Sequence, residues 1–198
     1  MHKNELKKEI SSICRERINA GVSHTVIAID GRCASGKTTL AGELAALLEN
    51  ELSAVVNIIH MDDFFLRPEQ RTEKRLATPG ENVDHERFLD EVLIPLHDIR
   101  PLSYRPFSCH DMALSDETVS LIPGDIDIVE GSYSCHPKLY GYYDFRIFCD
   151  IDKDAQLARI INREESAAVA AFQEKWIPME ESYFDVYDIK RKCDYIID

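Results

Sequence analysis

Short apolar runs alternate with longer amphipathic stretches along this 198-residue chain. Continuous apolar runs, as opposed to alternating ones, are typical of parallel strands that are buried on both faces. The runs that we interpret as strands are 26–29, 54–60, 118–122, 125–131, 145–149 and 193–198. Because helical segments separate most of them, the pattern predicts an α/β fold with a parallel sheet.

Apolar residues between these runs recur at helical spacing. Leu6, Ile10, Ile13 and Ile18 predict an amphipathic lead-in helix over 3–19, within residues 1–20. The pattern predicts further helices around 40–48 and from an Asp84 cap to residue 96, with a bend at Pro95. It also predicts a short helix at 136–141, a helix over 152–165, and one over 167–187 with a break at 176–179.

Two segments lack this periodicity. Residues 66–82 mix basic and acidic side chains with two prolines and a glycine, so we expect a functional or mobile loop. Residues 101–111 are rich in ring and hydrogen-bonding side chains, and they predict either the wall of a substrate pocket or an ordinary β-hairpin. We expect 66–82 and 101–122 to lie on the substrate side of a single domain, 1–198.

The first strand leads into a phosphate-binding pattern, GRCASGKT at 31–38, which fits G-x-x-x-x-G-K-[ST] at every fixed position. Its glycines let backbone N–H groups converge on an anion, and the following helix adds its positive dipole end. Lys37 would reach the β- and γ-phosphates, and Thr38 would ligate Mg²⁺. The residues expected to bind the nucleotide, ATP or GTP, are Gly31, Cys33, Ala34, Ser35, Gly36, Lys37, Thr38 and Thr39.

Acidic residues lie at the carboxyl ends of two of the strands, at the sheet edge where ligands bind in α/β folds. Asp62 and Asp63 are placed to act on a substrate hydroxyl, the alternative being a helix cap or a solvated turn. Glu130 has the character of a Walker-B acid that holds Mg²⁺ directly or through water, the alternative being a cap for the next helix. Phe64 and Phe65 would divide between core and pocket wall.

Basic residues form two further groups. Arg159 and Arg163 are four apart and share a helix face, from which they would neutralise a transferring phosphate. The alternative is that they pair only with surface acids such as Glu164 and Glu165. The basic residues of 66–82 would contact an anionic group or form a solvated face: Arg67, Arg71, Lys74 and Arg75.

Composition and charge exclude some classes of binding partner. The net charge of −13 argues against nucleic acid or an anionic membrane as the main partner. No apolar run approaches the roughly 18 residues of a membrane span, and the N-terminus lacks a signal-peptide core, so a cytoplasmic protein is expected. The six cysteines show no C-x-x-C spacing, which favours reduced thiols over a zinc site. The sequence leaves open whether the chain is a homo-oligomer.

Three motifs carry a family resemblance: GRCASGKT at 31–38, MDDFF at 61–65 and IVEG at 128–131. Over residues 25–198 the chain resembles the uridine kinase family and its relatives, nicotinamide riboside kinase and phosphoribulokinase. The resemblance implies a P-loop NTPase three-layer sandwich, with a five-stranded parallel core sheet in the order 2-3-1-4-5 and helices on both faces. It also implies an ATP- and Mg²⁺-dependent transfer to the 5′-hydroxyl of a uridine- or cytidine-like nucleoside, as in nucleoside salvage.

The resemblance also implies residue roles. Asp62 would be the general base on the ribose 5′-hydroxyl. The catalytic cations would be Lys37 and, in a lid spanning 152–175, Arg159 and Arg163. The metal ligands would be Thr38, Asp62 and Glu130. The acceptor would be bound by Asp62, Phe65, Asp84 in NVDHERF, Tyr104 and His110.

The chain departs from the family pattern near the base pocket. The family's Tyr-Asp is Tyr104-Arg105-Pro106 here, and the histidine after the tyrosine is shifted by one position. A kinase for nicotinamide riboside, pantothenate or a sugar phosphate is therefore an alternative, and the basic residues of 66–82 favour an anionic acceptor. A nucleotide-dependent regulatory switch without an acceptor is a third hypothesis, against which Asp62 and the two lid arginines count.

Overall fold

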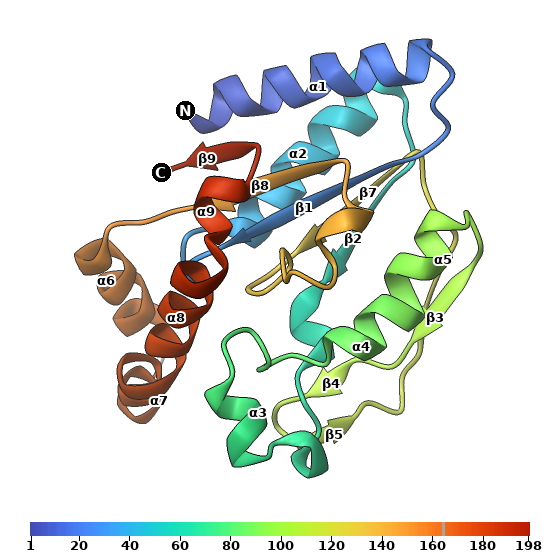
Figure 1. The fold of residues 1–198 in the computed structure, drawn as a ribbon. Helices are drawn as coiled ribbons and strands as arrows, with labels where there is room; N and C mark the ends of the chain where they lie inside the picture. Colours follow the sequence, from blue (N-terminus) through green and yellow to red (C-terminus); the bar gives the residue numbers. More distant parts are fainter. Residues whose placement is uncertain (164) are drawn as a thin grey trace.

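The computed structural model describes residues 1–163 and 165–198, and it contains a central sheet of five parallel strands (Figure 1). In spatial order these are β2 (Val56–His60), β7 (Ile126–Glu130), β1 (Thr25–Gly31), β8 (Phe145–Cys149) and β9 (Tyr195–Ile197). Counted along the chain, this is the order 2-3-1-4-5, so the predicted α/β fold and strand order are confirmed.

Side chains of β1 alternate between two cores, one on each face of the sheet. Ile27 and Ile29 pack with α1 (Lys3–Asn19) and α2 (Lys37–Leu52). Val26 and Ala28 point to the opposite core, with residues from α4 (His85–Phe88), η3 (Leu89–Leu93), α5 (Ile94–His97) and α8 (Ile177–Tyr187). Because successive strand residues face opposite sides, one strand supports both helical layers.

The lead-in helix has the predicted length but a different buried stripe. Leu6, Ile10 and Cys14 are fully buried against α2, whereas Ile18 is 39% exposed. Spacing of four residues keeps side chains on one helix face, and Cys14 continues that series where Ile13 and Ile18 do not. The predicted stripe was therefore wrong at its C-terminal end.

Residues 66–82, predicted as a loop, contain two short helices, η2 (Pro68–Gln70) and α3 (Glu73–Ala77). The Thr72 hydroxyl caps α3 by accepting a hydrogen bond from the backbone N–H of Arg75. The Arg75 guanidinium then donates to the carbonyl of Val83 and to Glu86. A β-bridge between Phe65 and Val83 closes the base of the segment, so local caps and ion pairs order it.

Residues 102–121 form two small antiparallel pairs. β3 (Leu102–Tyr104) pairs with β6 (Val119–Leu121), and β4 (Phe107–Ser108) pairs with β5 (Ala113–Leu114). Each strand within 101–111 therefore pairs antiparallel, as in a hairpin, but with a partner strand that lies outside this segment. The predicted strand at 118–122 is β6.

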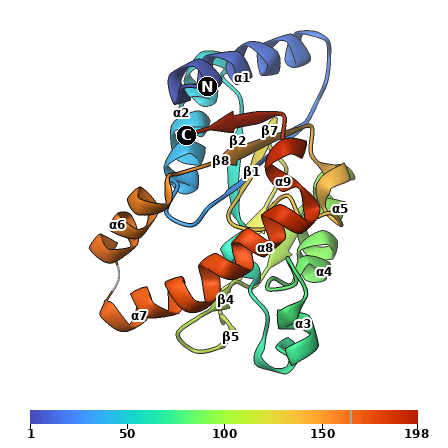
Figure 2. The same cartoon turned by 60° about the vertical axis from the view of Figure 1, so that its left-hand side comes forward.

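The C-terminal helices lie close to the predicted ranges, 152–165 and 167–187, but without the predicted break at 176–179. After α6 (Lys153–Arg163), α7 (Ser166–Ala171), the π-helical turn η5 (Phe172–Trp176) and α8 form one continuous rod, which Figure 2 shows. The predicted break at 176–179 is wrong. Proline in the interior of an α-helix clashes with the preceding turn and removes a hydrogen bond, but here the wider π-helical turn η5 lies just before Pro178, and the helix continues through it. Pro95 likewise lies two residues after η3. The remaining elements are η1 (Met61–Phe64), η4 (Tyr140–Tyr142) and α9 (Ile189–Lys192).

Candidate active site

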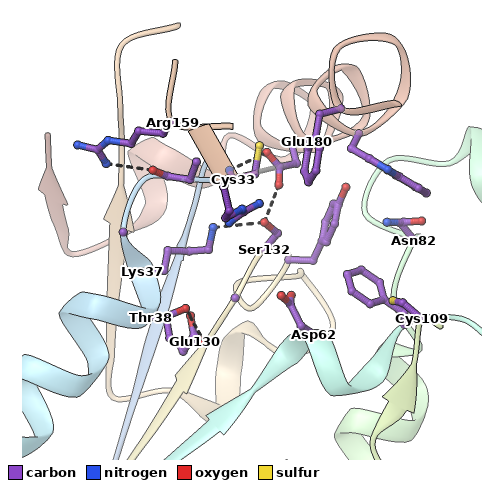
Figure 3. A pocket seen from close by; sticks show the side chains of 18 of the residues that line it. Cys33, Lys37, Thr38, Asp62, Asn82, Cys109, Glu130, Ser132, Arg159 and Glu180 are labelled. Atoms are coloured by element: carbon purple, nitrogen blue, oxygen red, sulfur yellow. Dashed lines mark hydrogen bonds between the residues drawn. The ribbon is translucent and has the colours of Figure 1, made fainter. Parts of the chain in front are cut away.

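The carboxyl ends of β1, β2 and β7 open into a cavity of about 750 Å³ (Figure 3). The phosphate loop and the start of α2 form one wall, and segments that follow β2 and β7 form the floor. Residues of α6, η5 and α8 face them from the C-terminal part of the chain. The lining therefore combines residues from both ends of the sequence, as expected for a ligand site at a sheet edge.

The phosphate loop depends on its two glycines. A Cβ on Gly31 would lie 2.0 Å from the carbonyl oxygen of Cys149, because β1 pairs with β8 there. Gly36, at a φ of 96°, turns the chain into α2. Among the predicted nucleotide residues, Gly31 and Ser35 lie beneath the surface, and the cavity is lined by Cys33, Ala34, Gly36, Lys37, Thr38 and Thr39.

The Lys37 ammonium lies inside this loop. Its Nζ donates to the carbonyls of Gly31 at 2.8 Å and Arg32 at 2.9 Å, and to the Ser132 hydroxyl at 3.3 Å. The contact to Ser132 links the loop to the segment that follows β7. The cation is thus held between the phosphate loop and the substrate side of the cavity.

Glu130 and Thr38 form an oxygen cluster at the cavity floor. The Thr38 hydroxyl donates to the two Glu130 carboxylate oxygens at 3.1 and 3.2 Å, and Glu130 is buried at the end of β7. His60 Nδ1 lies 2.6 Å from the same carboxylate, and this hydrogen bond raises the pKa of His60. Glu130 does not cap a following helix, because the next described helical turn begins only at Tyr140. Hard oxygen ligands of this kind suit Mg²⁺.

The acid pair after β2 divides between two environments. Asp62 lines the cavity, and a Cβ on Gly131 would lie 3.3 Å from its Oδ1, so glycine permits this approach. Enclosure by protein atoms raises the pKa of Asp62, Lys37 opposes this, and Glu130 adds to it. Asp63 instead accepts a hydrogen bond of 3.2 Å from the Tyr104 hydroxyl.

The other predicted acceptor residues lie in different places. Phe65 lines the cavity. Tyr104 is buried against Phe64, and its hydroxyl is directed to Asp63. Asp84 is buried, caps α4 and accepts from Gln70, while the side chain of His110 is 94% exposed at the turn between β4 and β5. Asp84, Tyr104 and His110 are therefore outside the cavity lining.

Both lid arginines line the cavity from α6. Arg159 donates to the carbonyl of Ala34 at 3.0 Å, and the Arg163 guanidinium lies 5.7 Å from the centre of the Phe172 ring. Gln156, on the same helix, donates to the carbonyl and the Sγ of Cys33 at 3.1 Å. Arg159 is thus directed to the phosphate loop. The alternative partner Glu164 lies outside the described residues.

Sequence reasoning missed several lining residues that come from other segments. They are Asn82, Ser132, Tyr133, Trp176 and Glu180, whereas Arg71 belongs to the basic segment 66–82, Cys109 and Met112 to the expected substrate-side segment 101–122, and Phe172 to the expected lid 152–175. Trp176 is the only tryptophan in the chain, a signal that was available. Glu180 belongs to no recognised motif, and it lies near the phosphate loop only because the chain folds α8 against that loop.

A second cluster of potential ligands lies beside the cavity. Ligand atoms of Glu81, His85 and His136 fall within 4.8 Å of one another. The two imidazole rings stack at 4.2 Å and 14°, so their in-plane lone pairs run parallel instead of converging on one ion. His136 Nδ1 accepts from the backbone N–H of Lys138, which places the proton on Nε2. The ring stacking and the hydrogen bond from Lys138 therefore indicate that His85 and His136 pack α4 against the segment after β7.

His136 should make the fold acid-sensitive. Burial, with His85 and Lys138 adding, lowers the pKa of His136 to about 3. The pKa in the unfolded chain is about 6.5, so the native state binds fewer protons between the two values and loses stability as the pH falls. From pH 7 to pH 5 this contributes a loss of about 2 kcal/mol.

Urea unfolding of a His136→Asn variant at pH 7 and pH 5 measures this contribution. The asparagine oxygen can still accept from Lys138, so we expect lower stability at pH 7 but a loss between the two pH values that is smaller by about 2 kcal/mol. His110→Asn, at an exposed histidine, serves as the control. Equal acid losses in His136→Asn and the unchanged protein would contradict the prediction.

Comparison with known proteins identifies the family of this chain. Residues 26–168 match the model of the Phosphoribulokinase / Uridine kinase family. Uridine-cytidine kinase B of Dictyostelium discoideum is 31% identical over 158 residues, which cover 74% of this chain but only 62%, less than two thirds, of that protein. Uridine kinase of Staphylococcus carnosus (strain TM300) is 28% identical over 188 residues, 87% of this chain and 86% of its own.

Among solved structures, one titled "Structure of a Possible Uridine Kinase from Bacillus stearothermophilus" has the same fold. It superposes with a TM-score of 0.69 at 24% identity and covers 98% of this chain and 100% of its own. In the part of the chain that the structure describes, no helix combines the length and apolar character needed to cross a bilayer.

Proposed function

The chain belongs to the phosphoribulokinase/uridine kinase family, and from this premise we propose that it transfers the γ-phosphate of ATP to the 5′-hydroxyl of a nucleoside resembling uridine or cytidine. The observation that carries the proposal is the meeting of three groups in one cavity. These are the phosphate loop with Lys37, the Asp62 carboxylate, and the Thr38–Glu130 oxygen pair. An acceptor site beside a phosphate site is what phosphoryl transfer requires.

In the proposed reaction, Asp62 accepts a hydrogen bond from the acceptor hydroxyl and takes its proton as the oxygen attacks the γ-phosphorus in line. A raised pKa makes the Asp62 carboxylate a better base. Lys37, Arg159 and Arg163 compensate the charge on the transferring oxygens. Thr38, Glu130 and Asp62 would hold Mg²⁺, which supplies further charge neutralisation when bound.

The acceptor side of the cavity carries one arginine of the basic segment 66–82. Of the four basic residues of 66–82, Arg71 lines the cavity, and its guanidinium is engaged by the carbonyl of Leu66 and the ring of Phe107. Arg75 is paired with Glu81 and Glu86. Relatives named uridine kinase support a nucleoside, and the reaction would then serve nucleoside salvage.

An assay of ADP release with Mg-ATP and a panel of acceptors tests the proposal. The panel holds uridine, cytidine, other nucleosides, nicotinamide riboside, pantothenate and sugar phosphates. We expect rapid release only with a nucleoside. Release only with a sugar phosphate would retain the kinase and refute the nucleoside. Slow hydrolysis that no acceptor stimulates would refute the kinase and favour a nucleotide-dependent switch.

A further inference from the structure

Glu180 of α8 reaches into the phosphate loop (Figure 3). One oxygen of its carboxylate accepts a hydrogen bond of 2.9 Å from the backbone N–H of Cys33. The other accepts one of 2.6 Å from the Ser132 hydroxyl, to which Lys37 also donates. Glu180 is 5% exposed and lies 147 residues from Cys33 in sequence.

This contact places a carboxylate where the loop would otherwise hold phosphate oxygens. The N–H groups of such a loop form an anion site, and a carboxylate satisfies them with the same kind of oxygen acceptor. Cys33 precedes the start of α2, and the N–H groups at the start of α2 bind the inner phosphates in such loops. The Ser132 hydroxyl contacts both Glu180 and Lys37, and Lys37 is the lysine that reaches the outer phosphates. Glu180 therefore lies at the terminal-phosphate end of the loop.

We infer that Glu180 competes with the terminal phosphate of the nucleotide for the phosphate loop, and thereby reduces the preference of the site for triphosphate over diphosphate. A γ-phosphate near the Cys33 N–H meets a like charge, because the Glu180 carboxylate is beside it. A diphosphate ends before this position and leaves the contact intact. The inference rests on the proposed function only in that the loop binds a nucleoside triphosphate.

Displacement of Glu180 would also move the helix that carries it. Trp176 lies four residues earlier on the same helical rod and lines the same cavity. Residues four apart share a helix face, so a shift of Glu180 changes the surroundings of the indole. Because Trp176 is the only tryptophan, its emission reports on this movement without labelling.

The test compares the Kd of a non-hydrolysable ATP analogue and of ADP, both with Mg²⁺, in the unchanged protein and in Glu180→Gln. Removing the charge should tighten binding of the analogue by about tenfold and change the Kd of ADP by less than about threefold. In the unchanged protein, the analogue should shift Trp176 emission and ADP should not. Asp185→Asn, an exposed acid on the same helix, controls for net charge and should leave the ratio unchanged.

Other outcomes overturn the inference. If Glu180→Gln weakens binding of both nucleotides, Glu180 supports the loop instead of competing for it. If the Kd ratio stays the same in a variant with unchanged thermal stability, the carboxylate has no role in selectivity. Because binding is measured without turnover, a changed ratio in a protein that phosphorylates no acceptor would uphold the inference while the kinase proposal fails.

Discussion

An Asp62→Asn variant should lose about 10²–10⁴-fold in turnover while binding nucleotide in the absence of Mg²⁺ with a nearly unchanged Kd. The amide keeps the size of the side chain but cannot take the proton of the acceptor hydroxyl. Because Asp62 lines the cavity and, among the described residues, makes no hydrogen bond to the phosphate loop, the nucleotide site itself is retained. Acceptor-dependent ADP release and a separate nucleotide titration measure the two quantities.

Asp63→Asn is the matched control, since it changes the same residue type one position along the chain. Asp63 accepts from the Tyr104 hydroxyl and is not part of the cavity lining, so its loss should reduce turnover by less than about tenfold. An Asp62→Asn enzyme that keeps more than a tenth of its turnover would remove Asp62 from the role of general base. Equal losses in both variants would point to a shared structural effect.

Replacing Asp30 with alanine should destabilise the fold by at least about 4 kcal/mol. The Asp30 carboxylate is fully buried and accepts four hydrogen bonds, from the backbone N–H groups of Gly31, Tyr133 and Cys135 and from the Tyr183 hydroxyl. Burial raises the pKa of Asp30, and these donors oppose the shift. Alanine would leave all four donors buried without an acceptor.

Urea unfolding of Asp30→Ala and Tyr183→Phe tests this network. Tyr183→Phe removes one donor and leaves the carboxylate with three, so we expect a loss of about 1 kcal/mol. If Asp30→Ala is no less stable than Tyr183→Phe, the carboxylate does not hold these segments together. If Asp30→Ala is unfolded at all urea concentrations, the Tyr183→Phe value still measures one of the four contacts.

The sheet could be predicted because each of its strands has a recognisable local sequence pattern. Buried parallel strands need continuous apolar runs, and the phosphate loop needs glycines where backbone approaches backbone, as at Gly31 beside Cys149. The positions of Asp62, just after β2, and Glu130, at the end of β7, could be predicted because the carboxyl ends of parallel strands meet at one edge of the sheet. Asp30 gave a local signal that was not used, since a carboxylate inside an apolar strand must find buried donors.

Other features depend on contacts that no local pattern contains. The Thr72 cap of α3 is a local signal, but the helix also depends on the contacts of Arg75 with Val83 and Glu86, which only the folded segment supplies. Tyr104 and His110 were assigned to the base pocket by resemblance, yet Tyr104 packs into the core and His110 is exposed at a turn. Their positions depend on the pairing of the small strands at 102–121, which the side-chain pattern does not specify.

The π-helical turn η5 before Pro178 determines the rotation of α8 about its own axis. One extra residue in a turn rotates the following helix by about 100° relative to a continuous α-helix. Without it, Glu180 would lie about a quarter-turn away from Cys33, and Ser132 would lose its partner. The π-helical turn thus sets which face of α8 points to the phosphate loop. A single-residue insertion or deletion between 172 and 178 would therefore turn Glu180 away from this loop, although it lies outside the phosphate site.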